Sequence, residues 1–275
     1  MRPPPVPHFL RLRGRRFSYL DFGGPGPTLL ALHGHFGRGS GYAPLAAALT
    51  GRYRVLAPDL RGHGLSDNGG TFTPEEYVAD TAALLHALDL TPAAVLGHSM
   101  GGALAFLLAA DHPELVQTLV VADMTVKNQP PETQPILDIT DWPRRAPSRE
   151  ALREAVEARG IPDATYFLDS AHLFPDGWGF LFDQADLMAS QAALAGDFSA
   201  AWLRSAGPPA PLLRAEHSFL LSPATARWMA GARPDTTLRQ LPTCGHWLHT
   251  DDPDGCAAAV AGFLDGRRTG PGPAQ

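Results

Sequence analysis

The sequence predicts an α/β fold, in which a mostly parallel sheet has helices on both faces and one helical segment is inserted. Short apolar runs such as residues 28–32 alternate with helical segments of about a dozen residues, a pattern typical of parallel sheets. This alternation stops near residue 124 and resumes near residue 211. The length of 275 residues suits one large domain or a domain with an insertion.

The chain is expected to begin with two antiparallel strands, because residues 9–13 and 16–22 alternate apolar and polar side chains around Gly14. Apolar runs and the alternation of strands with helices predict the parallel strands that follow. These are expected at residues 28–32, 53–57, 93–96, 115–122, 211–215 and 236–241. The intervening helices are expected at residues 42–49, 74–88, 101–110 and 252–264, with Thr73 as the N-cap of the second.

Residues 124–211 lack the apolar runs of buried strands and are rich in proline and aromatic side chains. Helical stretches are expected there near residues 148–159, 165–173, 182–193 and 198–203. The simplest organisation is a core over residues 1–125 and 206–265 with a helical cap over residues 126–205. The tail, residues 266–275, is expected to be disordered.

Composition argues against several classes of function. The formal net charge is −6 and the arginines are scattered, whereas nucleic-acid-binding proteins carry a basic stripe. No apolar run approaches the ~20 residues of a membrane span, and the N-terminus lacks the apolar region of a signal peptide. The two cysteines, Cys244 and Cys256, are too few for a disulfide framework, so a cytoplasmic location is expected.

A serine lies in the motif Gly97-His-Ser-Met-Gly101, directly after the apolar run at residues 93–96. Such a strand-to-helix turn holds its serine in a strained conformation and needs small neighbours on both sides. The strain lifts the hydroxyl above the sheet edge, next to a helix N-terminus. We therefore expect Ser99 to be a nucleophile.

A serine hydroxyl needs a base to accept its proton, and His246 is the best candidate. It lies in the loop between the last expected strand and the last helix, and it follows the serine in chain order. His33, His63 and His98 are expected to be hydrogen-bonding residues of turns and core. His249 lies three residues after His246, but no cluster of ligands completes a metal site around the pair, so no metal is expected.

Two carboxylates compete for the role of the acid that orients His246. Asp123 ends the strand predicted at residues 115–122, at the sheet edge where open parallel sheets build their sites. The acid most commonly lies in the turn after the strand at residues 211–215. Glu216 is in this turn, but it comes at the very end of the strand, earlier than the usual position of the acid. Ser218 and Phe219 occupy the positions where an aspartate would be expected. Asp123 is favoured, and Glu216 remains the alternative.

The loop after the first parallel strand, Leu32-His-Gly-His-Phe-Gly37, is expected to form an oxyanion hole. Backbone N–H groups of Met100 and of His35 or Phe36 would point at the oxygen that becomes charged. Gly34 and Gly37 would let the main chain approach the substrate closely.

With these residues placed, the chain resembles the α/β-hydrolase superfamily over residues 9–125 and 208–265. The resemblance rests on residues 32–37, 59–67, 97–102 and 245–249. The H-G-x-F-G loop, the position of Asp123 and the G-H-W-x-H segment are similar to the small esterase and thioesterase branch. Members of that branch place the acid where Asp123 stands, which in this chain is 24 residues after Ser99. They often continue Asp-x-x-Pro, where this chain has Asp123-Met-Thr-Val126, and the resemblance does not extend over residues 126–205.

The resemblance implies a serine hydrolase that cleaves esters or thioesters of small to medium apolar acyl groups through an acyl-enzyme, without a cofactor. Perhydrolase, lactonase and C–C bond hydrolase activities use the same triad and remain alternatives. A ligand receptor without catalysis is the alternative of another class, because fold alone does not fix chemistry.

Substrate contacts are expected from the loops and from aromatic side chains of the inserted segment, since ligand pockets are mostly apolar. The residues expected to contact substrate are Gly34, Met124, Trp142, Phe174, Trp178 and Trp247. Lys127, Arg144 and Arg145 could attract an anionic group, but a solvated surface is the favoured interpretation of these charges.

Overall fold

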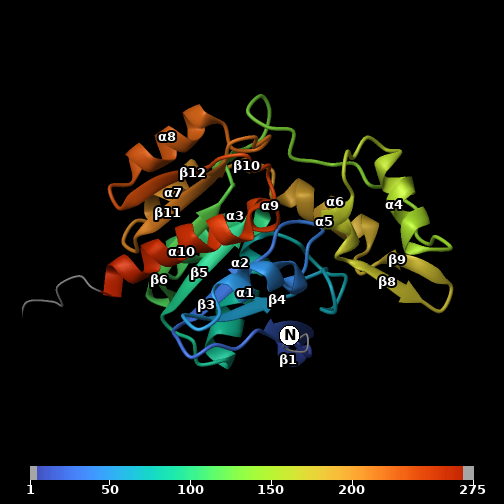
Figure 1. Ribbon diagram of the computed structural model, residues 1–275, viewed down its shortest axis with the longest axis horizontal. Helices are drawn as coiled ribbons and strands as arrows, with labels where there is room; N and C mark the ends of the chain where they lie inside the picture. The colour runs from blue at the N-terminus through green and yellow to red at the C-terminus, as the bar shows by residue number, and fades with distance from the viewer. Residues whose placement is uncertain (1–4, 269–275) are drawn as a thin grey trace, which may run out of the picture.

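The structure is a computed structural model that describes residues 5–268, without the side chains of residues 266–268. The described residues form an eight-stranded sheet in the order β1-β2-β4-β3-β5-β6-β11-β12 (Figure 1). Its strands are β1 (His8–Leu12), β2 (Arg15–Asp21), β3 (Thr28–Leu32), β4 (Arg54–Pro58), β5 (Ala93–His98), β6 (Val116–Ala122), β11 (Ala210–Ala215) and β12 (Thr236–Leu241). β2 pairs antiparallel with β1 and β4, and the remaining neighbours are parallel. The predicted α/β architecture is confirmed.

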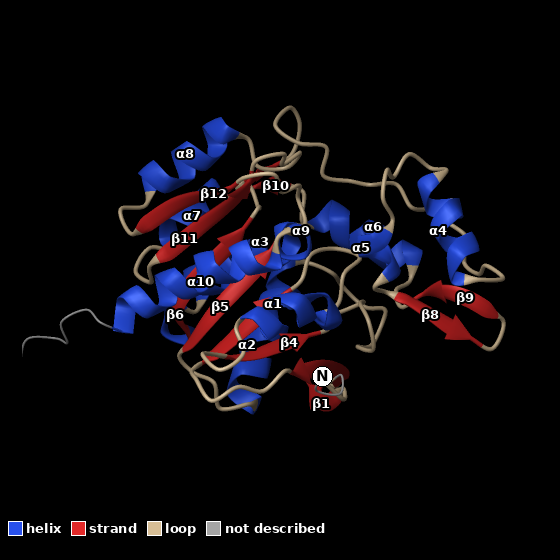
Figure 2. Cartoon of the chain, viewed as in Figure 1, coloured by secondary structure: helices blue, strands red, loops and turns tan. Residues whose placement is uncertain are grey.

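Helices cover both faces of this sheet (Figure 2). One face carries α2 (Pro74–Ala87), α3 (Met100–Asp111), α7 (Ser199–Arg204) and α8 (Pro223–Ala232). The other carries α1 (Ala43–Ala48), α9 (Leu248–Asp251) and α10 (Pro253–Arg268). Thr73 caps α2 as predicted, because its side chain accepts a hydrogen bond from the N–H of Glu76.

The parallel strands contribute side chains to the apolar cores on both faces of the sheet. Leu30 and Leu32 of β3 pack into the core on one face, whereas Leu29 and Ala31 pack into the core on the other. A strand with both faces buried is apolar along its whole length, which explains why continuous apolar runs predicted the sheet.

The segment between β6 and β11, here called the insertion (residues 126–205), mixes helices with two short antiparallel strand pairs. It contains β7 (Lys127–Asn128), α4 (Arg149–Glu157), α5 (Thr165–Leu168), β8 (Ala171–Phe174), β9 (Gly177–Phe180), α6 (Gln184–Ala193), β10 (Gly196–Asp197) and α7. β7 pairs with β10 and β8 with β9. Most of the insertion surrounds an apolar core of its own, whereas Trp202 of α7 belongs to a core of the sheet. The division of the chain into core and cap stays a prediction.

Two predicted segment boundaries were wrong. The helix expected over residues 165–173 ends at Leu168, and residues 171–180 form the β8–β9 hairpin. Pro175 and Asp176 form its turn, and Gly177, the first residue of β9, takes a φ of 128°, which only glycine adopts readily. The tail was expected to start at residue 266, but the backbone of α10 continues to Arg268. Residues 269–275 of the expected tail lie outside the described residues.

Candidate active site

Ser99 occupies the tight turn between β5 and α3. Its φ of 52° and ψ of −125° lie outside the regions favoured by residues with a side chain. The turn is close-packed, because a Cβ added to Gly97 would overlap the carbonyl oxygen of Gly101. A Cβ on Gly101 would in turn overlap the carbonyl oxygen of Leu32. The small residues of the motif are therefore required by the turn that exposes the hydroxyl, as predicted.

Asp123 and His246 come together at the carboxyl edge of the sheet. The Oδ2 atom of Asp123 lies 2.8 Å from Nδ1 of His246, and both side chains are buried. Asp123 follows β6 with a φ of 47°, and its own N–H donates to the carbonyl of Leu213 in β11. The backbone thus turns the carboxylate toward the loop after β12, which carries His246.

Two more donors satisfy the buried Asp123 carboxylate. The N–H of Ala215 donates to Oδ1 at 2.9 Å, and the hydroxyl of Ser218 donates to Oδ2 at 2.6 Å. Ser218 stands where the sequence lacks the expected aspartate, and it contacts the carboxylate that comes from β6 instead. Glu216 is exposed, and its Oε2 accepts from the N–H of Thr243 at 2.9 Å. The geometry therefore brings Asp123, and not Glu216, to His246.

The loop after β3 lies beside Ser99. A Cβ on Gly34 would lie 3.0 Å from the Cβ of Ser99, so this glycine permits the close approach. The carbonyl oxygen of Gly34 accepts hydrogen bonds from Nδ1 of His33 at 2.8 Å and from the N–H of Gly37 at 3.2 Å. Phe36 has a φ of 66°, which completes this turn.

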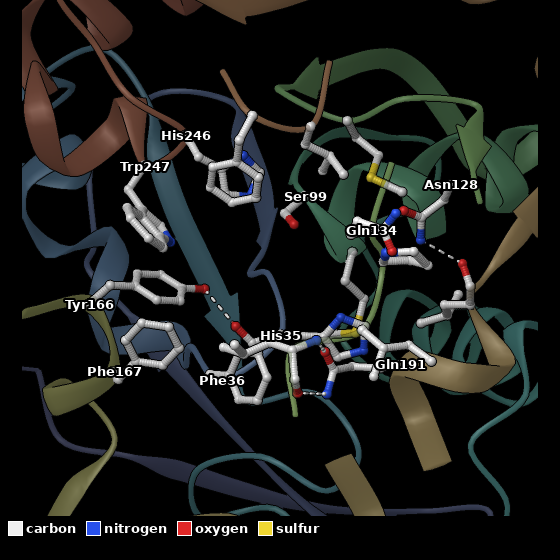
Figure 3. Close-up of a pocket in the computed structure, with 18 of the residues that line it drawn as sticks. His35, Phe36, Ser99, Asn128, Gln134, Tyr166, Phe167, Gln191, His246 and Trp247 are labelled. Atoms are coloured by element: carbon white, nitrogen blue, oxygen red, sulfur yellow. Dashed lines mark hydrogen bonds between the residues drawn. The ribbon is translucent and has the colours of Figure 1, made fainter. Parts of the chain in front are cut away.

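Ser99 and His246 line one cavity of about 410 Å³, a size common for small-molecule sites. One side, here called the aromatic wall, consists of Phe36, Tyr166, Phe167, Phe219 and Trp247. The opposite side, here called the amide wall, contains Met124, Asn128, Gln134, Leu137, Gln191 and Leu194. Figure 3 shows the labelled members of the two walls facing each other, with Ser99 and His246 above them. None of the described residues that line this cavity is Lys, Arg, Asp or Glu.

The six residues expected to contact substrate divide into two groups. Met124 and Trp247 line the cavity, and Gly34 abuts Ser99 without lining it. Trp142 is buried in the core of the insertion, and its ring lies 5.2 Å from that of Phe167. Trp178 belongs to the β8–β9 hairpin, and Phe174 lies there beneath the guanidinium of Arg145. The structure therefore places Trp142, Phe174 and Trp178 away from the cavity.

Tyr166, Asn128, Gln134 and Gln191 line the cavity but were not singled out from the sequence. Two of the amides bond the backbone of the insertion. Nδ2 of Asn128 donates to the carbonyl of Leu194 at 2.8 Å, and Oε1 of Gln191 accepts from the N–H of Leu137 at 2.8 Å. These hydrogen bonds depend on the fold of the insertion, so no local sequence pattern predicts them.

Buried histidines surround the site. Nε2 of His98 donates to the carbonyl oxygen of His246 at 2.7 Å, and burial holds the pKa of His98 well below its ordinary value. Burial also lowers the pKa of His33, His63 and His249 to about 3. These rings are uncharged near neutral pH, which is consistent with the structural role predicted for His33, His63 and His98.

Comparison with known proteins identifies the family. The model described as "Alpha/beta hydrolase family" matches residues 29–259. The sn-1-specific diacylglycerol lipase ABHD11 of Mus musculus is 30% identical over 264 residues, which span 90% of this chain and 84% of that protein. The 2-(acetamidomethylene)succinate hydrolase of Mesorhizobium japonicum is 30% identical over 273 residues, or 94% of this chain and 96% of that protein. The crystal structure of an E-2-(acetamidomethylene)succinate hydrolase has a TM-score of 0.82 at 23% identity and covers 95% of this chain and 99% of its own.

The chain therefore belongs to the alpha/beta hydrolase family, and the predicted fold and family are confirmed. The similar proteins named above are hydrolases. Within residues 5–268, no helix is long and apolar enough to cross a membrane. The same residues contain no group of three or more His, Cys, Asp or Glu side chains that could hold a metal ion.

Proposed function

We propose that this protein is a serine hydrolase that cleaves uncharged carboxylic esters or thioesters through an acyl-enzyme. The observation that carries this proposal is the buried 2.8 Å contact between Asp123 and His246, at the cavity that Ser99 also lines. A carboxylate on Nδ1 leaves Nε2 of the imidazole free to accept a proton, which is the arrangement that a serine nucleophile requires.

In the proposed reaction Ser99 attacks the carbonyl carbon while Nε2 of His246 accepts the proton of the hydroxyl. The imidazolium that forms keeps its Nδ1–H bond to Asp123. The N–H of Met100 and that of His35 or Phe36 stabilise the oxyanion, a contribution of about 3–4 kcal/mol for each good donor. His246 then protonates the leaving alcohol or thiol, and a water repeats the sequence to release the acid.

The lining supports an uncharged acyl group as substrate. Aromatic side chains form one wall, the polar members of the other wall are uncharged amides, and no Lys or Arg is among the described residues that line the cavity. A substrate with a carboxylate would have to leave water without a paired cation, which is costly. The substrate in the name of the Mesorhizobium relative is a succinate. We expect this chain to reject such dianions and to prefer neutral acyl groups.

The test is hydrolysis of p-nitrophenyl esters from C2 to C12 and of matching thioesters, with the wild type and Ser99→Ala. The proposal predicts turnover by the wild type, none above background by Ser99→Ala, and at least tenfold slower cleavage of a succinyl monoester than of a neutral ester of equal length. Activity only with lactones, or only with peroxide and a carboxylic acid, would favour the alternative activities of the same triad. Ligand binding without any turnover would favour a receptor.

A further inference from the structure

Three hydroxyl groups of the insertion bond the loop that carries the predicted oxyanion donors. Oη of Tyr166 donates to the carbonyl oxygen of His35 at 3.1 Å, and Oγ of Ser170 donates to the carbonyl oxygen of Phe36 at 2.5 Å. The third hydroxyl, Oγ of Ser190, lies 2.9 Å from Nε2 of the His35 ring. Figure 3 shows the first of these bonds at the edge of the cavity. We call Tyr166, Ser170 and Ser190 the hydroxyl clamp.

The clamp residues are built into the interior. Ser170 and Ser190 are fully buried, and Tyr166 is 8% exposed. They come from three places in the insertion, namely α5, the turn before β8, and α6. Hydroxyls from separate elements thus converge on consecutive residues of one short loop of the sheet domain.

Peptide geometry connects these bonds to the oxyanion donors. In a trans peptide the carbonyl of one residue points opposite to the N–H of the next. Holding the His35 carbonyl therefore fixes the direction of the Phe36 N–H. Holding the Phe36 carbonyl fixes the direction of the Gly37 N–H, which donates to the Gly34 carbonyl at 3.2 Å. Because this bond holds the Gly34 carbonyl, it also fixes the direction of the His35 N–H. Both predicted donors of this loop are thus oriented through contacts with the insertion.

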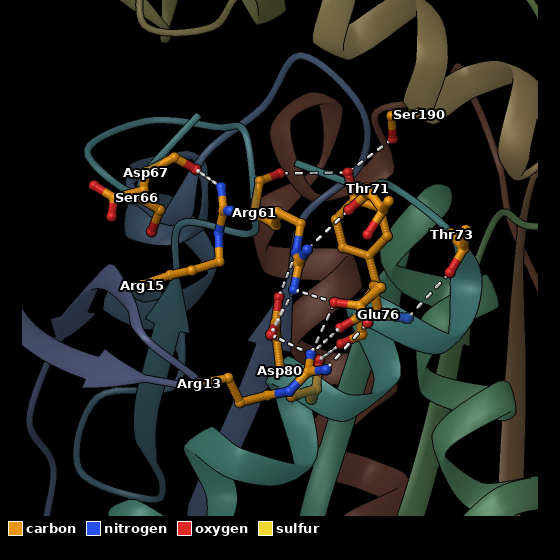
Figure 4. Close-up of polar contacts among 12 residues, drawn as sticks. Arg13, Arg15, Arg61, Ser66, Asp67, Thr71, Thr73, Glu76, Asp80 and Ser190 are labelled. Atoms are coloured by element: carbon orange, nitrogen blue, oxygen red, sulfur yellow. Dashed lines mark hydrogen bonds and ion pairs between the residues drawn. The ribbon is translucent and has the colours of Figure 1, made fainter. Parts of the chain in front are cut away.

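Ser190 also contacts a hydrogen-bonded network of the core. Its Oγ also lies 2.8 Å from Oη of Tyr77 in α2, and that phenol donates to the carbonyl oxygen of Arg61 at 3.3 Å. Nε of Arg61 is in turn bound to Asp80 at 2.7 Å. Figure 4 shows Ser190 at one edge of this network. Ser190 is therefore held in place while it contacts His35.

We infer that Ser170 and Ser190, together with Tyr166, are positioning residues for the oxyanion hole, so that the insertion completes the catalytic machinery in addition to covering it. This inference rests on the proposed function, because an oxyanion hole has a role only if Ser99 attacks a carbonyl. A donor misplaced by about 1 Å can cost up to 10²-fold in rate. The loss falls on the transition state, because the charge on the oxygen develops there.

The test compares Ser170→Ala and Ser190→Ala with Ser205→Ala, a matched control. Ser205 is also fully buried, and its hydroxyl also donates to a backbone carbonyl, that of Trp202 at 2.8 Å, but it contacts no residue of the loop. For each clamp variant we expect kcat for a p-nitrophenyl ester to fall about tenfold to a hundredfold with KM within about twofold. Ser205→Ala should stay within twofold in both constants. Tyr166→Phe should also lower kcat, and because Tyr166 lines the cavity its KM can change too.

A second measurement separates positioning from damage to the fold. The inhibition constant of a trifluoromethyl ketone, which forms an oxyanion on Ser99, should rise by the factor by which kcat/KM falls. The inhibition constant of an unreactive primary alcohol of equal chain length should not change, because it forms no oxyanion. Partial unfolding would lower the fraction of active sites, as titrated with a fluorophosphonate, without changing either inhibition constant.

The fluorophosphonate also distinguishes the two ways of failing. If the reagent labels wild-type Ser99 and both alanine variants match Ser205→Ala in kcat and in ketone binding, the clamp is refuted and the proposed function stands. If the reagent does not label wild-type Ser99 and no ester is cleaved, the proposed function is refuted and the clamp with it.

Discussion

The two halves of the candidate site are supported by different parts of the molecule. Asp123 is held by Ala215 and Ser218, which belong to β11 and the turn after it. The loop at residues 34–37 is held instead by hydroxyls of the insertion. The proposed acid–base half is thus complete within the sheet and its loops, whereas the proposed oxyanion half needs the insertion.

This difference suggests how substrate could influence catalysis. The insertion supplies every amide-wall residue except Met124, and it also supplies Tyr166 and Phe167 of the aromatic wall. The same segment carries the clamp. A substrate that displaces the insertion would therefore change the alignment of the oxyanion donors, while the contact between Asp123 and His246 stayed unchanged.

The first prediction concerns the acid. Asp123→Asn should lower kcat by about 10³-fold to 10⁴-fold, because an amide cannot stabilise the imidazolium and favours the wrong tautomer. Glu216→Gln should change kcat less than about threefold, since this exposed carboxylate bonds only the backbone N–H of Thr243 among the contacts in the described part of the chain. Steady-state kinetics on one ester decides between them. A larger loss from Glu216→Gln would overturn the acid–base half as described here.

The second prediction concerns the stability of the fold, to which the buried, uncharged histidines around the site contribute. Burial lowers the pKa of His33, His63 and His249 to about 3, far below the unfolded value of about 6.5. The unfolded chain therefore binds protons first as the pH falls, so stability is fully present above pH 6.5 and is lost below it. Through each of these histidines, the free energy of unfolding should fall by about 2 kcal/mol between pH 7 and pH 5.

Urea unfolding of the wild type and His249→Gln at the two pH values measures this loss. The variant should lose about 2 kcal/mol less than the wild type between pH 7 and pH 5. His86→Gln, which changes an exposed histidine of α2, serves as the control and should match the wild type. An equal loss in all three proteins would show that His249 is protonated in the folded state.

The acid–base half could be predicted from the sequence because its residues follow strand ends. The carboxyl ends of neighbouring parallel strands meet at one edge, so residues after β5, β6 and β12 converge there. Ser99, Asp123 and His246 occupy those places, and apolar runs mark β5 and β6. The choice between Asp123 and Glu216 needed the backbone turn at Asp123, which directs its carboxylate to His246.

The cavity walls and the clamp could not be predicted in this way. Trp142 and Trp178 were expected at the cavity because they are large and aromatic, but such side chains serve equally well in a core. Ser170 and Ser190 act through single hydrogen bonds to a loop far away in the sequence. A lone serine in a helix or turn carries no pattern that indicates such a partner.

The third prediction returns to the acid–base half. Ser218→Ala should lower kcat about tenfold, because the buried carboxylate of Asp123 loses its 2.6 Å hydrogen bond and is held less firmly against His246. Ser222→Ala, which removes an exposed N-cap of α8, is the control and should lower stability by about 1 kcal/mol without affecting kcat. If Ser218→Ala retained full activity, Ala215 and His246 alone would suffice to fix the carboxylate.

The last prediction combines the halves in double-mutant cycles. Ser218 and Ser170 share no hydrogen-bond partner, so the effects of their alanine variants on the activation free energy should add within about 0.5 kcal/mol. Ser170 and Ser190 restrain the same loop, so their cycle should show coupling above that limit. Coupling between Ser218 and Ser170 as large as that within the clamp would mean that the two halves move together. Displacement of the insertion would then disturb His246 as much as the oxyanion donors, and the separate support of the two halves would have no consequence for catalysis.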